Sequence, residues 1–154
     1  IFMPTFEEYT RTSFGHKVNK SARLMTQRLA YHFKSNNYDV TTEQWRLLLY
    51  LWREDGQTQN SLAQCTGKDE PSVSRIINTM EKHNLVVRTQ HPHDRRTNLI
   101  FLTEKGKSLR DPLMALGQKV NAEITQGISP EDLTVCMKVL DKVLDNLYKL
   151  QNSR

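Results

Sequence analysis

Two adjacent arginines, Arg95 and Arg96, follow an aspartate in the stretch HPHDRRT, residues 91–97. Guanidinium groups keep their charge at all physiological pH values and bind phosphates or carboxylates through paired hydrogen bonds. The apolar runs on either side predict strands, so the arginines are expected on the loop of a β-hairpin. Exposed arginines on such a loop indicate a polyanionic partner. Asp94 has the wrong sign for contact with that partner and must serve another purpose.

A second group of polar side chains lies upstream, in the stretch PSVSRIINTMEKHN, residues 71–84. At 100° per residue, one face of this predicted helix is apolar. It is formed by Val73, Ile76, Ile77 and Met80. The opposite face carries Arg75 and Asn78, and its margins carry Ser72 and Ser74. A helix with an apolar back and this front suits the major groove of DNA, although each front residue could also be an ordinary solvated side chain.

The elements that must hold these two groups follow from periodicity and from cap residues. Apolar residues between 14 and 33 recur every three or four positions and predict a long helix, broken at SNNYD, residues 35–39. Further helices are expected after Thr41 or Thr42, after Thr58 and around Pro71. LVVRT (85–89) and NLIFL (98–102) are predicted strands, and QHPHDRRT is the loop that joins them. Thr103 opens the last helical part, which restarts at GISPED, residues 127–132.

This order of elements predicts a mainly α fold with a small β-hairpin wing. Residues 40–107 are expected to form a winged helix-turn-helix, and 6–36 and 108–150 are expected to form flanking helices, all within one 154-residue unit. The last helix has a wider apolar face than one partner helix usually covers. We therefore predict that the flanking helices are dimerisation helices, buried between two copies of the chain.

Charge and composition limit the possible classes of protein. The net charge is +5, and residues 71–107 carry seven basic and three acidic side chains, an excess of four. This local excess is typical of a polyanion binder, although a solubilising surface gives the same count. No apolar run approaches the roughly 20 residues of a membrane span, and the first residues do not resemble a signal peptide. The two cysteines lie far apart, which favours a reduced, cytoplasmic protein with no membrane association.

Several stretches resemble the MarR family, the multiple-antibiotic-resistance type of bacterial transcription regulator. They are SLAQCTGKDEPSVSRIINTMEKHNLVVR and HPHDRRTNLIFLTEKG, together with the flanking long helices. The family's wing typically has Asp-x-Arg, here Asp94 and Arg96, and its strand ends in a Leu-Thr-x-x-Gly turn, here Leu102, Thr103 and Gly106. The resemblance implies a DNA-binding homodimer on a palindromic operator. It also implies a repressor that a small ligand, often phenolic or anionic, releases from double-stranded DNA.

The expected DNA contacts divide between the helix and the wing. Ser72, Ser74, Arg75 and Asn78 are predicted to face the major groove. On the wing, we expect Arg95 to meet phosphates and Arg96 to enter the minor groove. Asp94 is expected to brace the guanidinium of Arg96 through two parallel hydrogen bonds.

Other functions have less support in the residues. No catalytic motif such as GxSxG or HExxH is present, so we predict no enzyme and no cofactor. His83, His91 and His93 lack nearby cysteines, and we predict no metal site. Cys65 and Cys136 are expected to be buried, inert thiols.

The sequence is also compatible with two other hypotheses about function. One is a winged-helix module that binds protein, and the other is a ligand-binding helical dimer without specific DNA binding. For an effector, His16, Lys20 and Trp45 are the candidate contacts, and its identity is unknown.

Overall fold

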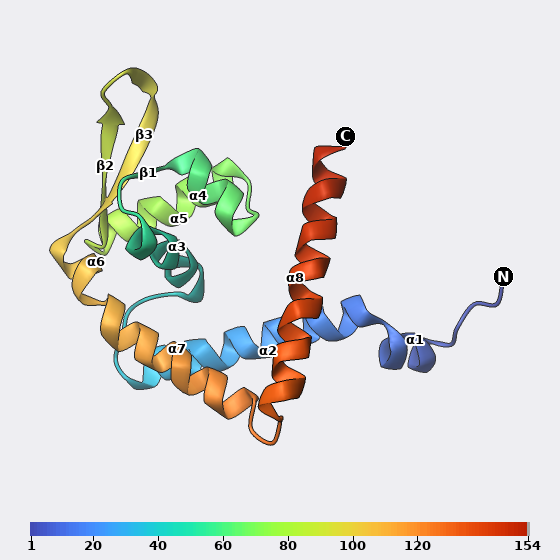
Figure 1. Ribbon diagram of the computed structural model, residues 1–154. Coiled ribbons are helices and arrows are strands. Elements are labelled where there is room, and N and C mark those ends of the chain that lie inside the picture. The colour runs from blue at the N-terminus through green and yellow to red at the C-terminus, as the bar shows by residue number, and fades with distance from the viewer. Residues whose placement is uncertain (154) are drawn as a thin grey trace. The chain divides into compact units, whose positions relative to one another are not determined.

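Three capped helices, of which the polar helix is the last, form a lobe in the computed structural model, which describes residues 1–153. They are α3 (Thr42–Arg53), α4 (Gln59–Thr66) and α5 (Glu70–Lys82). Thr41 caps α3 in a capping box with Gln44, and Thr58 caps α4. Gly67 ends α4 in the left-handed conformation, at φ 68°, which glycine adopts without steric cost. These boundaries confirm the predicted helices and place α5 directly after the turn (Figure 1).

The core of this lobe joins the helices to the sheet. Leu47 and Leu48 from α3, Leu62 from α4 and Ile100 from the sheet are completely buried. The predicted apolar face of α5 is confirmed, because all four of its residues are buried: Val73, Ile76, Ile77 and Met80. The back of α5 is thus fixed in the core, and its front is free to meet another molecule.

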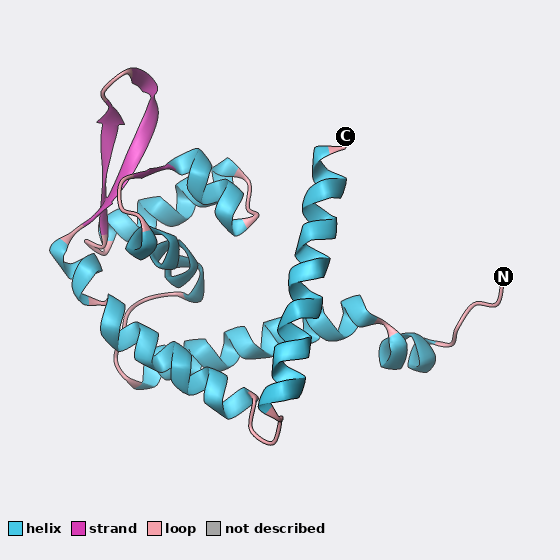
Figure 2. Cartoon of the chain, in the orientation of Figure 1, coloured by secondary structure: helices cyan, strands magenta, loops and turns pink. Residues whose placement is uncertain are grey.

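The sheet has three antiparallel strands in the order β1-β3-β2. They are β1 (Gln57–Thr58), β2 (Val86–His91) and β3 (Asp94–Leu102), drawn in magenta in Figure 2. Only Pro92 and His93 separate β2 from β3, so the predicted eight-residue loop is wrong, and Asp94, Arg95 and Arg96 lie in a strand. The strand continues past its apolar part because backbone pairing needs no hydrophobic side chain. An irregularity at Gln90 and His91 shifts the register near the tip.

Two helices precede this lobe, α1 (Phe6–Thr12) and α2 (Phe14–Ser35). Ser13 separates them, since its extended backbone ends α1 and its hydroxyl accepts a hydrogen bond from the backbone N–H of His16. The predicted helix from Phe14 onward is confirmed, and it ends where SNNYD begins. Of its residues only His32 and Phe33 are buried.

The chain ends in α6 (Glu104–Ser108), α7 (Arg110–Ile124) and α8 (Pro130–Asn152). Two compact units divide within α7, at Val120 and Asn121. The second unit consists mainly of α8, which has no buried residue. No helix within residues 1–153 combines the length and the apolar character needed to cross a membrane.

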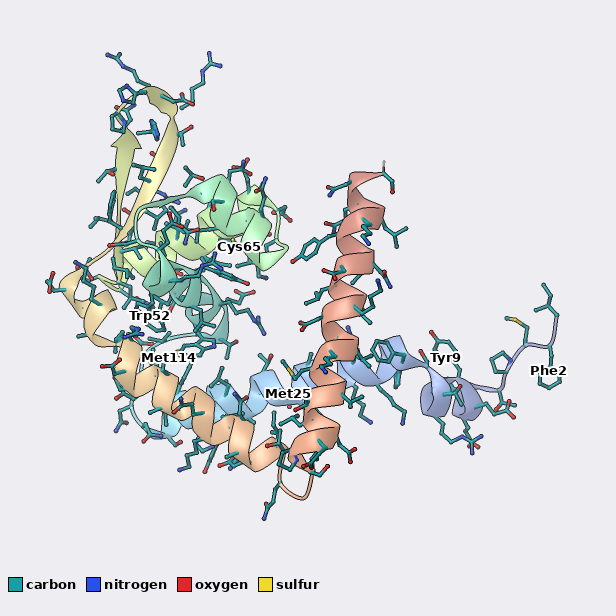
Figure 3. The ribbon with its side chains drawn as sticks, viewed as in Figure 1. Phe2, Tyr9, Met25, Trp52, Cys65 and Met114 are labelled. Carbon is teal, nitrogen blue, oxygen red and sulfur yellow. The ribbon has the colours of Figure 1, made fainter. Side chains whose placement is uncertain are left out.

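A close backbone contact fixes the base of the hairpin. A Cβ atom on Gly106 would lie 2.2 Å from the carbonyl oxygen of Leu85. The backbone N–H of Thr103 donates to the same oxygen at 3.0 Å, and the indole N–H of Trp52 donates to the carbonyl of Gly106 at 2.9 Å. Trp52 thereby ties α3 to the segment after the hairpin; Figure 3 labels it near Met114 of α7. The Leu-Thr-x-x-Gly turn therefore has a steric reason for its glycine.

We predict that Gly106→Ala destabilises the protein by roughly 1–3 kcal/mol, because the new methyl group must displace the backbone of Leu85. The measurement is the free energy of unfolding by urea at one fixed protein concentration. Gly15→Ala is the matched control, since a Cβ at Gly15 in α2 meets no atom within 4 Å. Its stability should be unchanged or raised by up to about 1 kcal/mol. Equal stabilities for the two variants would contradict the steric argument.

Candidate nucleic-acid interface

The front of α5 presents polar side chains as the helical periodicity predicts. Arg75 and Asn78 are exposed, whereas Ser72 and Ser74 are half-buried. A guanidinium nitrogen of Arg75 lies 3.5 Å from the hydroxyl oxygen of Ser72. The structure thus brings all four predicted residues to one surface of α5.

Ser72 also belongs to the N-terminal cap of α5. Its backbone N–H donates to a carboxylate oxygen of Asp69 at 2.7 Å. Hydrogen bonds from the backbone and side chain of Ser72 lower the pKa of Asp69, and Arg75 contributes in the same direction. A negative cap at a helix N-terminus is also favoured by the helix dipole. Ser72 therefore helps to fix the start of α5 in addition to lining its front.

Arg88, in β2, contacts the polar side of α5 more extensively than any predicted site residue. Its Nη1 atom donates to Asn78 Oδ1 and, at 2.6 Å, to Glu81 Oε1. Its Nη2 atom donates to the carbonyl and hydroxyl oxygens of Ser74, at 3.0 and 3.2 Å. The side chain of Arg88 is 19% exposed. This guanidinium links the strand to three successive turns of α5.

The sequence prediction included Arg88 only as part of the basic excess. A more specific signal was available, because side chains two positions apart in a strand share one face. Arg88 shares its face with the buried Val86, so it had to point inward, toward an acceptor. The acceptors themselves, on Ser74, Asn78 and Glu81, follow only from the three-dimensional packing of β2 against α5.

The hairpin tip is organised by Asp94, but not through the guanidinium of Arg96. Asp94 Oδ1 accepts from the backbone N–H of Arg96 at 2.9 Å, and Oδ2 accepts from the hydroxyl of Thr97 at 2.8 Å. Within residues 1–153 no ion pair joins Asp94 to Arg96. The predicted bracing of that guanidinium is therefore wrong in the free protein. A carboxylate this close in sequence satisfies the turn's own donors first.

The two wing arginines point away from each other. Arg95 and Arg96 are exposed and are neighbours in β3, and successive strand residues project from opposite faces. The carbonyl of Arg95 accepts a hydrogen bond from the side-chain amide of Gln90 at 3.0 Å, which fixes the backbone there. Both guanidinium groups are thus held out on a defined strand, one on each face of the hairpin.

The other candidate groups do not form a site. Within residues 1–153 no cluster of three or more His, Cys, Asp or Glu side chains is placed to hold a metal ion. Cys65 is half-buried and Cys136 is exposed, so the prediction that both thiols are buried is wrong for the single chain. For Cys136 the prediction assumed that the apolar stripe of α8 is covered, and in the single chain it is not.

The candidate effector contacts separate in the structure. His16 and Lys20 both line an open depression of about 500 Å³ between α1 and α2. Trp45 lies in the core, where its ring contacts Phe33 and Trp52 edge to face. The three residues therefore do not line one pocket.

The fold is a winged helix-turn-helix, and the comparisons find the same fold in transcription regulators. Residues 38–97 match the model of the MarR family. Transcriptional regulator PA3341 is 29% identical, with 88% of this chain and 98% of that chain covered and a TM-score of 0.75. The MarR transcriptional regulator from Methanosarcina mazei Go1 is 24% identical, with coverage of 88% and 96% and a TM-score of 0.82.

A third solved structure is a putative MarR family regulator from Listeria monocytogenes complexed with 26mer DNA. It is 24% identical, covers 88% of this chain and 89% of its own, and has a TM-score of 0.79. The chain is thus similar to MarR-family transcription regulators, through the family model over residues 38–97 and through the fold of these solved structures.

The hydrogen bonds at the hairpin tip give a prediction about Asp94. They lower its pKa below the ordinary value of 3.8, with the backbone N–H of Arg96 as the largest cause and the Thr97 hydroxyl as the second. A lowered folded-state pKa means that the stabilising contribution is complete above the ordinary value and is lost as the pH falls through the folded value. We expect Thr97→Val to raise the pKa of Asp94 toward 3.8, measured by carbon NMR titration of the carboxyl group.

Thr97→Ser is the control for this titration, because it keeps the hydroxyl donor and should keep the pKa of Asp94 low. Should Thr97→Val leave the titration of Asp94 unchanged, the hydroxyl does not hold the carboxylate in solution.

Proposed function

We propose that this protein is a sequence-specific DNA-binding regulator that acts as a homodimer on a palindromic operator. The observation that carries the proposal is the combination of a core-anchored helix with a donor-rich front and two exposed guanidinium groups on the adjacent hairpin. A helix of this kind fits the major groove, and arginines on a wing fit phosphates or the neighbouring minor groove. The DNA complex of the Listeria relative supports this use of the fold.

Within this proposal, the front of α5 reads base edges. Arg75 is the principal reading residue, because an exposed arginine can donate two hydrogen bonds to O6 and N7 of guanine. Asn78 and Ser74 lie next to Arg75 on the same front of α5, and Ser72 positions the start of the helix. On the wing, Arg96 enters the minor groove and Arg95 contacts phosphate, while Asp94 fixes the start of β3 directly before them.

The flanking helices are proposed to form the dimer. In the single chain α8 leaves many large apolar side chains exposed, which water does not favour. They are Val135, Met137, Val139, Leu144, Leu147, Tyr148 and Leu150. Helix α1 has no buried residue, and α2 exposes further apolar side chains, among them Phe14 and Val18. A second copy of the chain would cover these surfaces and would place two α5 helices about 34–36 Å apart for successive half-sites.

We further propose that the protein is a repressor that a small anionic ligand releases. The supporting feature is the depression between α1 and α2, which is rich in cationic side chains. Its lining consists of Thr10, Arg11, His16, Lys17, Lys20, Ser21 and Leu24. Helix α2 contains five Lys and Arg residues and no acidic residue. No negative side chain of this helix would therefore repel a carboxylate or phosphate ligand.

Two arginine variants test the proposed DNA contacts. Arg75→Ala should weaken operator binding by about 1–3 kcal/mol and relax the preference at one base position of each half-site. Arg95→Ala should weaken operator and random DNA alike and reduce the salt dependence by about one phosphate contact. The measurement is fluorescence anisotropy over a series of salt concentrations.

Arg46→Ala is the matched control, because Arg46 is an exposed arginine on α3 whose guanidinium contacts Thr26 of α2. It should bind like the wild type. If the wild type shows no salt-dependent binding to any DNA, the proposed function is wrong.

Charged side chains on the apolar stripe of α8 test the proposed dimer. We predict that the double variant Leu144→Glu with Leu147→Glu sediments as a monomer at micromolar concentration, because carboxylates cannot be buried unpaired in an apolar interface. Asn146→Glu adds the same kind of charge to another exposed position of α8 and should leave the dimer intact. A wild-type protein that sediments as a monomer would contradict the assembly directly.

A further inference from the structure

Arg88 occupies oxygen atoms that would otherwise belong to the reading surface of α5. It donates to the amide oxygen of Asn78 and to the hydroxyl oxygen of Ser74. A guanidinium has five N–H donors and no acceptor. Each partner of Arg88 must therefore turn an acceptor atom toward it to form a hydrogen bond.

This restriction fixes the orientation of the Asn78 side chain. An asparagine amide has one acceptor oxygen and one NH2 group, and the two look alike in shape. Because Arg88 can only donate, the oxygen must turn toward Arg88 and the NH2 group must turn away from it. Asn78 is exposed, so this NH2 group is what an approaching molecule meets.

The orientation is also energetically favoured. A hydrogen bond from a charged donor is roughly twice as strong as one between neutral groups. The side chain of Arg88 is 19% exposed and is also paired with Glu81. If the amide of Asn78 rotated away, Arg88 could not readily replace that hydrogen bond with one to water. Rotating the amide of Asn78 would place its NH2 group against the N–H groups of Arg88, which is repulsive.

The side chains next to Asn78 also present hydrogen-bond donors. Arg75 has only donors, and it lies three residues before Asn78, on the same side of the helix. The hydroxyl oxygen of Ser74 accepts from Arg88, so its hydrogen is available to donate. Asn78, Arg75 and Ser74 together form a surface that presents donors.

We propose that Arg88 is a specificity-determining positioning residue, which makes the reading face of α5 a donor surface and thereby selects guanine at Asn78. In the major groove guanine presents two acceptors, N7 and O6, whereas adenine presents N7 and the N6 donor. An asparagine reads adenine by using its oxygen and its NH2 group together, and here the oxygen is turned toward Arg88 and away from the groove. The inference rests on the proposed function, because it requires α5 to lie in the major groove.

The test begins with selection of operator sequences from random double-stranded DNA by the full-length wild-type protein. The base position read by Asn78 is the one whose preference disappears in Asn78→Ala. At that position the wild type should prefer guanine over adenine by about tenfold, the discrimination expected of two well-placed hydrogen bonds.

Two variants then change the orientation or the polarity of this side chain. Arg88→Lys keeps the charge beside Glu81, but its compact ammonium lacks the planar fork with which the guanidinium reaches Asn78, Ser74 and Glu81 at once, so the amide is released. The preference for guanine over adenine should fall to about threefold or less. Arg46→Lys is the matched control, since it removes a guanidinium that contacts Thr26 instead, and it should leave the preference unchanged.

Asn78→Asp keeps an acceptor for Arg88 and replaces the outward NH2 group with an oxygen. It preserves the contacts of Arg88, so it remains informative even if Arg88→Lys folds poorly, which circular dichroism will show. Its preference at the same position should change from guanine to cytosine, whose N4 amino group is a donor.

The inference is overturned if the wild type prefers adenine at the position read by Asn78, or if Asn78→Ala changes no position. It is also overturned if Asn78→Asp still selects guanine, or if a folded Arg88→Lys keeps the full preference. A wild type that selects no sequence at all overturns the proposed function itself, and the inference with it.

Discussion

The hydrogen bonds of Arg88 are the interaction on which the arrangement of this lobe depends. The proposed contact with DNA requires α5 and the neighbouring hairpin to have a fixed relative position. The hydrophobic core fixes the back of α5, but apolar contacts have little directional preference. Arg88 supplies direction, because its planar group reaches Ser74, Asn78 and Glu81 at set distances. Its pairing with Glu81 also neutralises its charge, so the cationic character of the surface comes from Arg75, Arg95 and Arg96.

Elements with a local cause were predictable from the sequence. Helix starts follow from Thr41, Thr58 and Thr103, whose hydroxyls accept backbone hydrogen bonds within the same turn, and the apolar face of α5 follows from its period. The extent of the hairpin was not predictable, because QHPHDRRT has no alternation of apolar and polar residues. Its strands are held by backbone pairing with each other. The partners of Arg88 and Asp94 were equally hidden, since side-chain pairing depends on which acceptors the fold brings near.

The two ends of the chain differ from the lobe in how their stability arises. The lobe has a core built mainly from α3, α4, α5 and the sheet, to which Phe33 of α2 and Leu113 of α7 also belong. Helix α8 has no buried residue, and a helix without packing is marginal in water. The physical requirement for α8 is therefore a cover for its apolar stripe, and two copies of one chain can provide it symmetrically. A dimer of this kind would couple the assembly of two chains to the order of α8.

The different roles proposed for the two wing arginines have a geometric basis that does not require Asp94 to brace the guanidinium of Arg96. Arg95 and Arg96 are successive residues of β3, and they leave the hairpin on opposite faces. When one face of a hairpin lies against a duplex, the other face must turn toward solvent or toward the rim of the groove. Two adjacent arginines can then never make the same contact, whichever face docks. Asp94 fixes the start of β3, because its carboxylate accepts hydrogen bonds from the backbone N–H of Arg96 and the hydroxyl of Thr97. The carboxylate of Asp94, which would repel a polyanion, thus acts on the backbone that orients the two arginines.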